Sequence, residues 1–461
     1  MNIRMFWKTV KSRMCSVYNP SYPLDDSFWY HFRQSAVVAR YGCREMADYY
    51  SYYPNGRKSD TYPPTIHYLY GFFMKCTRKL NIRDLCAVNI LNAFIFLFTG
   101  FLPYILFRRP IQALFSAIII CTTPIIVMRM GKMSLRGEIL VGALIVISIW
   151  LFYLPASPVT LLLISMIYCT MMLTTKTSLM FIESSLSLFL ALMLFNQVQY
   201  GYHFILTIVC FFIVRSHYKR RGIEFTLPTF RMCQAQKSET IHRSRYPYVT
   251  KEYILTEEEK PPSIKEVFYL IPFLPLSLVS AFFLPNTLLF FVVRLMTLFH
   301  LVGLYNGRRY LVHLAFFSAM LLVGIADLHP YVLVPSFVLN IIFLIVIGKN
   351  KQNNDVYIGV NWLKENVAPD SLIIAWWKYG HILSGYGGFR NIWDSYFINV
   401  DIFLKCERLF DNIVERTVDG ICFCNQNNAQ YLLVETFRSE CISNEYELCY
   451  QNKSIHIYRL F

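Results

Sequence analysis

The sequence is poor in charged residues, and its cysteines follow no pattern of a structural site. Asp, Glu, Lys and Arg make up only 16% of the 461 residues, whereas soluble domains carry about a quarter. None of the 13 cysteines belongs to a CxxC pair or to a Cys/His cluster with metal-binding spacing. Residues 1–24 contain no apolar run long enough for a signal peptide or a first membrane span. The cysteine usage therefore does not fix the redox compartment, and the charge deficit argues against a soluble enzyme.

The sequence is rich in long apolar runs. Hydrophobic residues make up 55% of the chain, and uncharged runs about as long as a bilayer is thick recur between residues 85 and 348. Short basic or proline-containing turns separate these runs. We therefore predict a polytopic α-helical membrane protein, which excludes a disordered chain and a soluble enzyme. The predicted spans lie at about 85–107, 110–128, 138–155, 158–174, 177–195, 200–215, 266–285, 286–303, 310–326 and 330–348.

The run pattern divides the chain into three predicted parts. Residues 1–84 form an N-terminal segment and a first external loop, in which a polar, turn-rich stretch precedes an interfacial helix at 64–80. Residues 85–348 form the transmembrane domain, which a charged external loop interrupts at 216–265. Residues 349–461 lose the apolar runs, and their helix-like stretch and short β-type runs predict an external soluble α/β domain.

The excess of positive charge has an explanation in a membrane protein. The 44 Lys and Arg against 29 Asp and Glu give a net charge of +15. Cytoplasmic loops collect Lys and Arg and face anionic lipid, so we predict no nucleic-acid partner. The turn Arg108-Arg109-Pro110 favours the cytoplasm, and parity then assigns the first loop, the long loop and the C-terminal domain to the far side. The basic cluster at 217–221 argues against this assignment for its own loop.

Acidic residues of the far-side loops favour one shared metal site. Asp26 follows Asp25 in the first loop, Glu138 ends the loop Arg136-Gly137-Glu138, and Glu239 lies in the long loop. A carboxylate from each loop would suit one hard divalent cation, Mn²⁺ or Mg²⁺. The alternative is that these side chains are merely solvated.

One charge lies inside a predicted span. Arg294 is flanked by the apolar residues of FFVVRLMTLF, and an ionisable residue within a span is a functional-site candidate. Its planar guanidinium would suit a diphosphate. The alternative is that it lies near the end of the span and extends to the surface.

Two adjacent tryptophans, Trp376 and Trp377, lie in the C-terminal domain within the stretch AWWKYGH. Such large side chains are expensive to expose, so they pack in a core or build a recognition surface. Composition by itself favours core packing at the end of a strand.

Several of these segments together resemble the catalytic subunit of oligosaccharyltransferase, an enzyme family that moves a glycan from a lipid diphosphate carrier onto Asn in Asn-x-Ser/Thr. The hallmark of that family is WWDYG, and the chain has WWKYG at 376–380. The first-loop segments DSFWYHFR, YYPNGR and TYPP are similar to the family's first external loop, and LNIRDLCAVNIL to the start of its next span. VVRLMTL, GFRNIWDSYFIN and YELCYQNKSIHIYRLF resemble its membrane arginine, its arginine and aspartate-asparagine stretch, and its terminal strands.

The resemblance implies a fold and a set of site residues. The fold is that of a C-type glycosyltransferase, here with about 10 to 11 transmembrane helices plus the soluble α/β C-terminal domain. The implied metal ligands for Mn²⁺ or Mg²⁺ are Asp26, Glu138 and Glu239, of which Asp26 and Glu239 are also catalytic. Arg294 would contact the carrier's diphosphate. The implied acceptor-binding residues are Trp376, Trp377, Lys378, Tyr379 and Gly380.

Two positions depart from the family's pattern. Arg136 replaces the first acid of the second-loop pair, and Lys378 replaces the Asp of the hallmark motif. In the family that Asp accepts a hydrogen bond from the acceptor's hydroxyl, whereas Lys can only donate. An active but divergent transferase, a transferase with a different acceptor, and an inactive paralogue serving as a membrane scaffold all stay open.

The implied activity is N-glycosylation, with a lipid-linked oligosaccharide and an acceptor polypeptide as partners. Other oligosaccharyltransferase subunits are further partners, and the implied location is the endoplasmic reticulum membrane or a bacterial or archaeal plasma membrane. A related C-type transferase that uses a lipid monophosphate sugar is an alternative, although it would not need the Trp-Trp motif. Asn452-Lys453-Ser454 is itself an acceptor-type sequon on the predicted far side.

Overall fold

The structure is a computed structural model that describes most of the chain. The described residues are 23, 27–45, 47–58, 64–101, 110–130, 135–152, 154–175, 178–194, 197–220, 238–243, 248–251, 254–255, 260–285, 287–325, 330–347, 354–397 and 399–461. Asp26, the first predicted metal ligand, lies outside these ranges.

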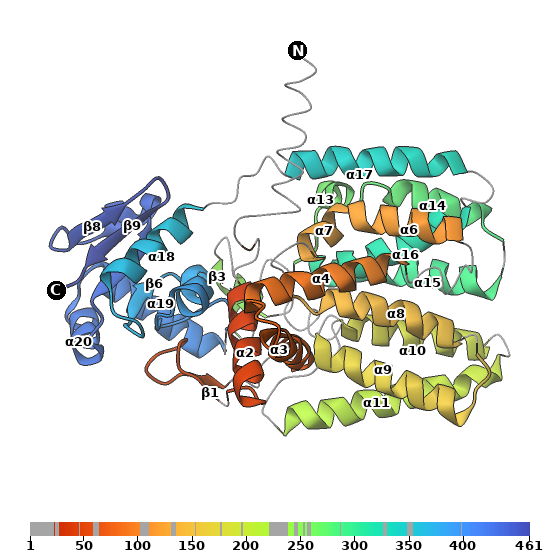
Figure 1. Cartoon of the computed structure of the whole chain (residues 1–461), viewed down its shortest axis with the longest axis horizontal. Coiled ribbons are helices and arrows are strands. Elements are labelled where there is room, and N and C mark those ends of the chain that lie inside the picture. Colours follow the sequence, from red (N-terminus) through yellow and green to blue (C-terminus); the bar gives the residue numbers. More distant parts are fainter. Residues whose placement is uncertain are drawn as a thin grey trace, which may run out of the picture.

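The chain forms a body of roughly parallel helices on one side and a smaller sheet domain on the other, with two helices of the first loop at the junction (Figure 1). The helices of the body are α4 (Asp84–Phe101), α6 (Pro110–Thr122), α7 (Pro124–Met130), α8 (Glu138–Phe152), α9 (Pro158–Thr174), α10 (Ser178–Leu194), α11 (Gly201–Lys219), α13 (Ile264–Leu270), α14 (Leu274–Phe283), α15 (Leu288–Gly303), α16 (Leu311–Gly324) and α17 (Leu333–Ile347).

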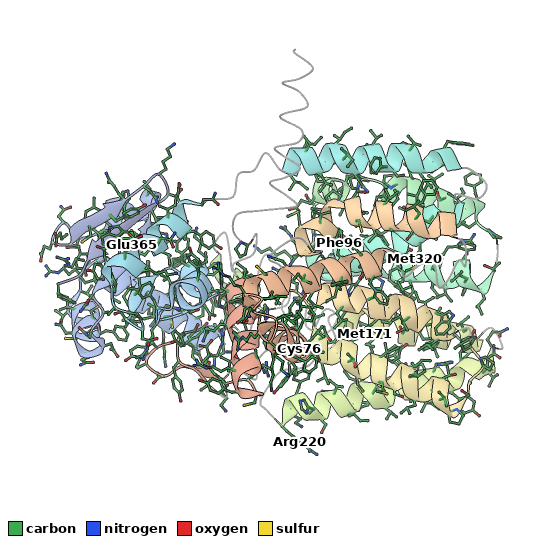
Figure 2. All side chains as sticks on the ribbon, in the orientation of Figure 1. Cys76, Phe96, Met171, Arg220, Met320 and Glu365 are labelled. Carbon is green, nitrogen blue, oxygen red and sulfur yellow. The ribbon has the colours of Figure 1, made fainter. Side chains whose placement is uncertain are left out.

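The helical body is apolar both inside and outside. All 14 residues of α16 are buried, so this helix forms the centre of the body. Figure 2 places Met171 and Met320 within the body, where both side chains are fully buried. The outer helices expose large apolar side chains, such as Leu162 on α9 and Phe212 on α11, which are 61% and 55% exposed. An apolar exterior of this kind suits a hydrocarbon environment and would be costly in water.

The helices occupy the predicted spans, but most of them are short for a bilayer. Among the described residues, Val198–Lys219 is the one stretch long and apolar enough to cross a membrane by itself. The bent pair α13 and α14 adds a second if the two helices form one span. Six further apolar helices are 10 to 17 residues long. The predicted count of about ten spans therefore stays a prediction.

Prolines break two of the predicted spans. The segment predicted as one span at 266–285 is two helices, α13 and α14, that meet at 82°. Pro272 and Pro275 lie at this break, and proline removes a helical hydrogen bond and clashes with the preceding turn. The predicted span 110–128 is likewise divided at Thr123, immediately before Pro124. Each of these two predicted spans thus consists of two helices rather than one continuous helix.

The first external loop is more ordered than predicted. It contains helix α2 (Ser27–Tyr41) and a hairpin of β1 (Ala47–Asp48) with β2 (Arg57–Lys58). The predicted interfacial helix is observed as α3 (Thr65–Arg78), which packs against α2. A Cβ on Gly71 of α3 would lie 2.7 Å from Val38 of α2, so the two helices are in close contact.

The long loop and the C-terminal domain each contain a small sheet. The long loop has a three-stranded sheet of β3 (Thr240–Arg243), β4 (Tyr248–Thr250) and β5 (Ile254–Leu255). The C-terminal sheet has the order β6-β7-β9-β8, with β6 parallel to β7. Its strands are β6 (Ile373–Ala375), β7 (Tyr431–Glu435), β8 (Glu447–Gln451) and β9 (Ile455–Arg459), and its helices are α18 (Asp355–Asn366), α19 (Val400–Val414) and α20 (Val418–Asn427).

One hydrophobic core joins the first loop to the C-terminal domain. The cluster of buried side chains includes Phe28 and Trp29 of α2, Tyr70 of α3, and Trp376 and Trp393 of the C-terminal domain. The sequence assigns these residues to separate predicted parts of the chain, whereas in the structure they are packed together. The sheet domain is therefore anchored on the first loop.

Candidate functional site

The Trp-Trp-Lys-Tyr-Gly segment begins directly after strand β6, and both tryptophan rings are buried. Trp376 and Trp377 are each 7% exposed. Trp376 lies edge-to-face on Trp393, with ring centroids 4.9 Å apart, and Trp377 packs on Phe397 at 5.4 Å. The core packing that composition favours is thus present. The indole Nε1 of Trp377 is nevertheless buried without a hydrogen-bond partner among the described residues.

A carboxylate that is not among the predicted site residues lies beside this segment. Glu435, the last residue of β7, pairs with the Lys378 ammonium and accepts a hydrogen bond of 3.0 Å from the Tyr379 hydroxyl. The Arg438 guanidinium lies 3.9 Å from the other oxygen of Glu435 and 4.0 Å from the ring centroid of Trp376. Burial raises the pKa of Tyr379, so the phenol stays a donor at neutral pH. A carboxylate acceptor is therefore present where the hallmark Asp is missing.

The parallel pairing of two strands brings Glu435 to this place. Ala375, which precedes Trp376, pairs with Leu433 of β7, so both strands end at the same edge of the sheet. Polar groups that converge at the carboxyl ends of parallel strands commonly form sites. The sequence signal was an acid directly after the β-type run YLLV, and it becomes informative only with the strand pairing known.

The described residues bring no three metal-type ligands together. Within the described ranges, no group of three or more His, Cys, Asp or Glu side chains is arranged to hold a metal ion. Glu138 begins α8 and is buried, 3.9 Å from Arg136. Glu239 is exposed and pairs with Lys251. Both carboxylates have the oxygen chemistry that a hard cation prefers, and with Asp26 undescribed the shared site stays a prediction.

Arg294 caps the end of a neighbouring helix. Its guanidinium donates hydrogen bonds to the main-chain oxygens of Ala281, at 2.7 Å, and Leu284. These are carbonyls at the C-terminal end of α14, which have no partner within their own helix. The contacts explain how a charge is tolerated among apolar side chains. The assignment of Arg294 to the carrier's diphosphate stays a prediction.

Asn452 lies in the turn between β8 and β9, and its side-chain amide is hydrogen-bonded. Its Nδ2 donates to the main-chain oxygen of Asp355 at 2.8 Å, and its Oδ1 accepts from the amides of Ser454 and Ile455. The predicted glycosylation at this sequon stays a prediction. Nδ2 also donates to the Tyr450 hydroxyl at 3.1 Å, so a glycan on Nδ2 would have to displace one of these two hydrogen bonds.

A buried ion network connects the first loop to the C-terminal domain. Arg57 donates to Asp394 at 2.7 Å and lies 3.4 Å from Asp48, its cross-strand partner in the hairpin. Arg33 donates to the same oxygen of Asp48 at 2.6 Å. Burial by itself would raise the pKa of Asp48, but Arg33 and Arg57 outweigh burial and hold that pKa below its usual value. Two arginines and two aspartates thus neutralise one another inside the core.

Two histidines extend this polar interface toward α3. The rings of His31 and His67 meet at 2.8 Å between Nδ1 and Nε2, and His31 Nε2 lies 2.8 Å from the hydroxyl of Tyr396. Arg44 lies 3.2 Å from the other nitrogen of His67. Burial, His31 and Arg44 all lower the pKa of His67 well below 6.5. His67 is therefore neutral in the folded protein at physiological pH.

We expect the folded chain to lose stability as the pH falls below about 6.5. An unfolded His67 binds a proton near pH 6.5, whereas the folded residue resists protonation, so acid favours the unfolded state. The thermal midpoint in detergent is expected to fall by several degrees between pH 7.5 and pH 5.0. His67→Gln is expected to reduce this difference. A midpoint equally pH-dependent in wild type and His67→Gln would contradict the assignment.

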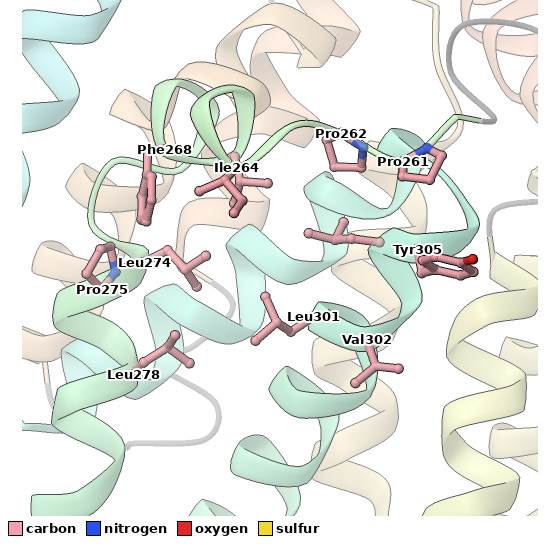
Figure 3. Close-up of a pocket in the computed structure, with 12 residues that line it drawn as sticks. Pro261, Pro262, Ile264, Phe268, Leu274, Pro275, Leu278, Leu301, Val302 and Tyr305 are labelled. Atoms are coloured by element: carbon pink, nitrogen blue, oxygen red, sulfur yellow. The ribbon is translucent and has the colours of Figure 1, made fainter.

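An apolar cleft opens beside the broken helix pair (Figure 3). Its volume is about 410 Å³. Phe268 of α13, Leu278 of α14 and Leu301 of α15 are among the side chains that line it. Arg308 lies nearby, since it pairs with Glu266 of α13 at 3.2 Å. The cleft therefore combines a hydrocarbon lining with a basic residue close by.

Comparison with solved structures shows a C-type glycosyltransferase fold. The oligosaccharyltransferase AglB of Archaeoglobus fulgidus, in complex with an inhibitory peptide and a dolichol-phosphate, superposes with a TM-score of 0.62 and 10% identity over 95% of this chain and 70% of AglB. The same enzyme tethered to an acceptor peptide with an NVT sequon gives a TM-score of 0.60, again at 10% identity over 95% of this chain and 70% of AglB. A third AglB structure contains Zn and sulfate.

A second membrane glycosyltransferase matches over the whole chain. ArnT of Cupriavidus metallidurans, bound to undecaprenyl phosphate, gives a TM-score of 0.55 at 10% identity over 100% of this chain and 98% of ArnT. No family model matches the sequence, and a search of curated proteins found no match. The C-type glycosyltransferase fold that the motif resemblance implied is thus confirmed, at a sequence identity of only 10% to each enzyme.

Proposed function

We propose that this chain is an integral membrane glycosyltransferase that moves a glycan from a lipid diphosphate carrier to the Asn side chain of an acceptor polypeptide. The observation that carries the proposal is the shared core of the first loop and the C-terminal domain. Helix α2, which starts one residue after Asp26, packs in the same cluster as Trp376 and Trp377. The helix that directly follows Asp26 in the sequence and the segment assigned to the acceptor thus belong to one structural unit.

The proposed chemistry divides between carboxylates and cations. Asp26, Glu138 and Glu239 would hold a divalent cation, Mn²⁺ or Mg²⁺, and the cation would supply charge stabilisation for the departing diphosphate. The acceptor amide nitrogen forms its bond to the anomeric carbon while the carbon–oxygen bond to the diphosphate breaks. Asp26 or Glu239 takes the amide proton, and Arg294 is the proposed protein cation for the diphosphate. Orienting the weakly nucleophilic amide is the main task of the carboxylates.

In the proposed acceptor site, Glu435 takes over the role of the missing acid. The carboxylate accepts from Lys378 and Tyr379, and we propose that it also accepts from a hydroxyl of the acceptor. Lys378 is neutralised by this pairing, so it does not by itself exclude a peptide with Ser or Thr two residues after Asn. The apolar cleft beside α13 is proposed to take part of the carrier's isoprenoid chain.

Transfer in vitro tests the proposed function. Purified protein, lipid-linked oligosaccharide, Mn²⁺ and a fluorescent Asn-x-Thr peptide are expected to give glycopeptide. Asp26→Ala is expected to lower the rate by about 100-fold or more, whereas the neighbouring Asp25→Ala serves as the matched control and keeps most of the rate. Carriers with longer isoprenoid chains are expected to react at lower concentration. A rate that is the same in wild type and Asp26→Ala would contradict the metal assignment.

A second candidate function deserves a test because of the ArnT likeness. The structural match covers 98% of the length of ArnT. A transferase that uses a lipid monophosphate sugar on another acceptor is therefore also compatible with the fold. Offering an undecaprenyl-phosphate sugar in place of the diphosphate carrier distinguishes the two. A chain that binds neither carrier would instead favour a membrane scaffold.

A further inference from the structure

A short segment lies between the first loop and the Trp-Trp-Lys-Tyr-Gly segment and bonds to both. We name residues 389–396 the bridging segment. The amide of Asn391 donates to the carbonyl of Tyr50 at 2.9 Å, and the amide of Tyr53 donates to the carbonyl of Asn391 at 3.1 Å. This pair of main-chain bonds fixes the bridging segment to the first loop, and the ion pair of Arg57 with Asp394 adds a side-chain link.

The other side of the bridging segment holds both ends of the Trp-Trp-Lys-Tyr-Gly segment, residues 376–380, which we name the acceptor segment. The Asn391 amide Nδ2 donates to the carbonyl of Gly380 at 2.9 Å, and the Trp393 indole donates to the carbonyl of Ala375 at 2.8 Å. Asn391 and Trp393 are both fully buried. Ala375 and Gly380 flank the four side chains from Trp376 to Tyr379. Both ends of the acceptor segment are therefore tied to the bridging segment.

The backbones are also in direct contact at Gly380. A Cβ on Gly380 would lie 2.3 Å from the carbonyl oxygen of Trp393 and 2.7 Å from the Asp394 Cβ, so no larger residue fits without displacement. A similar contact lies further along the chain, where a Cβ on Gly385 would lie 2.5 Å from the Trp29 Cβ of α2. Helix α2 thus packs on the turn that follows the acceptor segment.

We infer that Asn391 is a positioning residue that holds the acceptor segment in register with the first loop. This inference rests on the proposed function and deepens it. Asp26 precedes α2 and the acceptor segment follows β6, so we infer that the bridging segment sets how the acceptor's Asn meets the first-loop acid. Asn391 acts through the Gly380 carbonyl and does not need to touch a substrate.

The inference predicts a selective loss in acceptor use when Asn391 is changed. Asn391→Leu removes the donor to Gly380 without adding charge, and Asn391→Ala is made beside it because it adds no bulk. We expect the KM for the acceptor peptide to rise about tenfold, as the loss of one buried hydrogen bond implies. The KM for the lipid carrier is expected to stay within about twofold, since the carrier is bound by other elements.

A matched control has the same chemistry in the same domain. Asn366 also donates from Nδ2 to a main-chain carbonyl, that of Trp362 at 2.8 Å, but on the exposed end of α18. Asn366→Leu is expected to leave both KM values unchanged. Hydrogen–deuterium exchange supplies a readout that needs no activity: the amides of residues 377–381 are expected to exchange faster in Asn391→Leu and Asn391→Ala than in Asn366→Leu.

Three outcomes decide the matter. A peptide KM and exchange rates equal to those of Asn366→Leu would overturn the inference. A parallel rise in both KM values, with a large fall in the thermal midpoint, would assign Asn391 a general structural role and would also overturn it. If wild type transfers nothing, the proposed function fails, and faster exchange confined to residues 377–381 would still support the positioning role.

Discussion

Asp394→Ala is expected to lower the free energy of unfolding by about 3–5 kcal/mol, because it removes the closer carboxylate partner of the buried Arg57 guanidinium. The carboxylate that remains, Asp48, lies 3.4 Å away and is shared with Arg33. Arg57 and Asp394 are 2% and 0% exposed, and their nitrogen and oxygen lie 2.7 Å apart. Asp394 also accepts from the amide of Tyr396 at 2.8 Å, so a main-chain donor loses its partner in the same variant. Water does not reach these groups to compensate.

Thermal unfolding in detergent checks this prediction with a matched acid. Glu447 pairs with Arg459 at 3.1 Å, but both side chains are largely exposed. Exposed ion pairs contribute little to stability, so Glu447→Ala is expected to leave the midpoint almost unchanged. Equal thermal midpoints for Asp394→Ala and Glu447→Ala would show that the buried network does not hold the first loop and the C-terminal domain together.

Glu435→Gln is expected to weaken the preference for a hydroxylated acceptor by about 10-fold or more. The carboxylate is the acceptor in the proposed site, and hydrogen bonds to a charged group contribute about 1.5–3 kcal/mol. Gln keeps the size of the side chain but carries no charge, and its amide group can donate. Lys378 loses its ion pair with Glu435 in the same variant.

The measurement is the ratio of kcat/KM for two peptides, Asn-x-Thr and Asn-x-Ala. Wild type is expected to favour the hydroxylated peptide strongly, and Glu435→Gln is expected to shrink the ratio. Glu445→Gln is the control, since Glu445 lies on the surface and pairs with Arg416. A ratio near one in wild type, or one unchanged by Glu435→Gln, would exclude Glu435 as the acceptor of the hydroxyl.

Local patterns in the sequence were sufficient for much of the helical body. The apolar runs predicted helices where α8, α9, α10 and α15 are found, because burial in an apolar surrounding needs no partner-specific information. The breaks at Pro272 and Pro124 were missed because no charged residue interrupts the sequence run on either side of each proline. Run length by itself does not distinguish one span from two helices at an angle.

The helix of the first loop was missed for a different reason. Ser27, Phe28, Trp29, Tyr30 and His31 are all buried in succession. A helix that is covered on several sides shows no stripe of apolar residues at a spacing of three to four. Its polar and aromatic residues therefore resemble those of a loop until the C-terminal domain that covers them is known.

The side-chain contacts that the motifs did not predict join residues far apart in the sequence. Lys378 and Glu435 are 57 residues apart, and Arg57 and Asp394 are 337 apart. The first contact depends on the parallel pairing of β6 with β7, and the second on the packing of the first loop against the C-terminal domain. No local spacing specifies either arrangement. The motif resemblance identified the segments, and the fold determines which side chains meet.

The most direct test of the account is to identify the atom that receives the sugar. Purified protein is incubated with lipid-linked oligosaccharide, Mn²⁺ and a peptide with a single Asn-x-Thr, and the product is fragmented in a mass spectrometer. The account predicts a glycan attached to the Asn side chain in wild type and absent in Asp26→Ala. A sugar found on a hydroxyl or on a lipid acceptor, with the Asn unmodified, would contradict it.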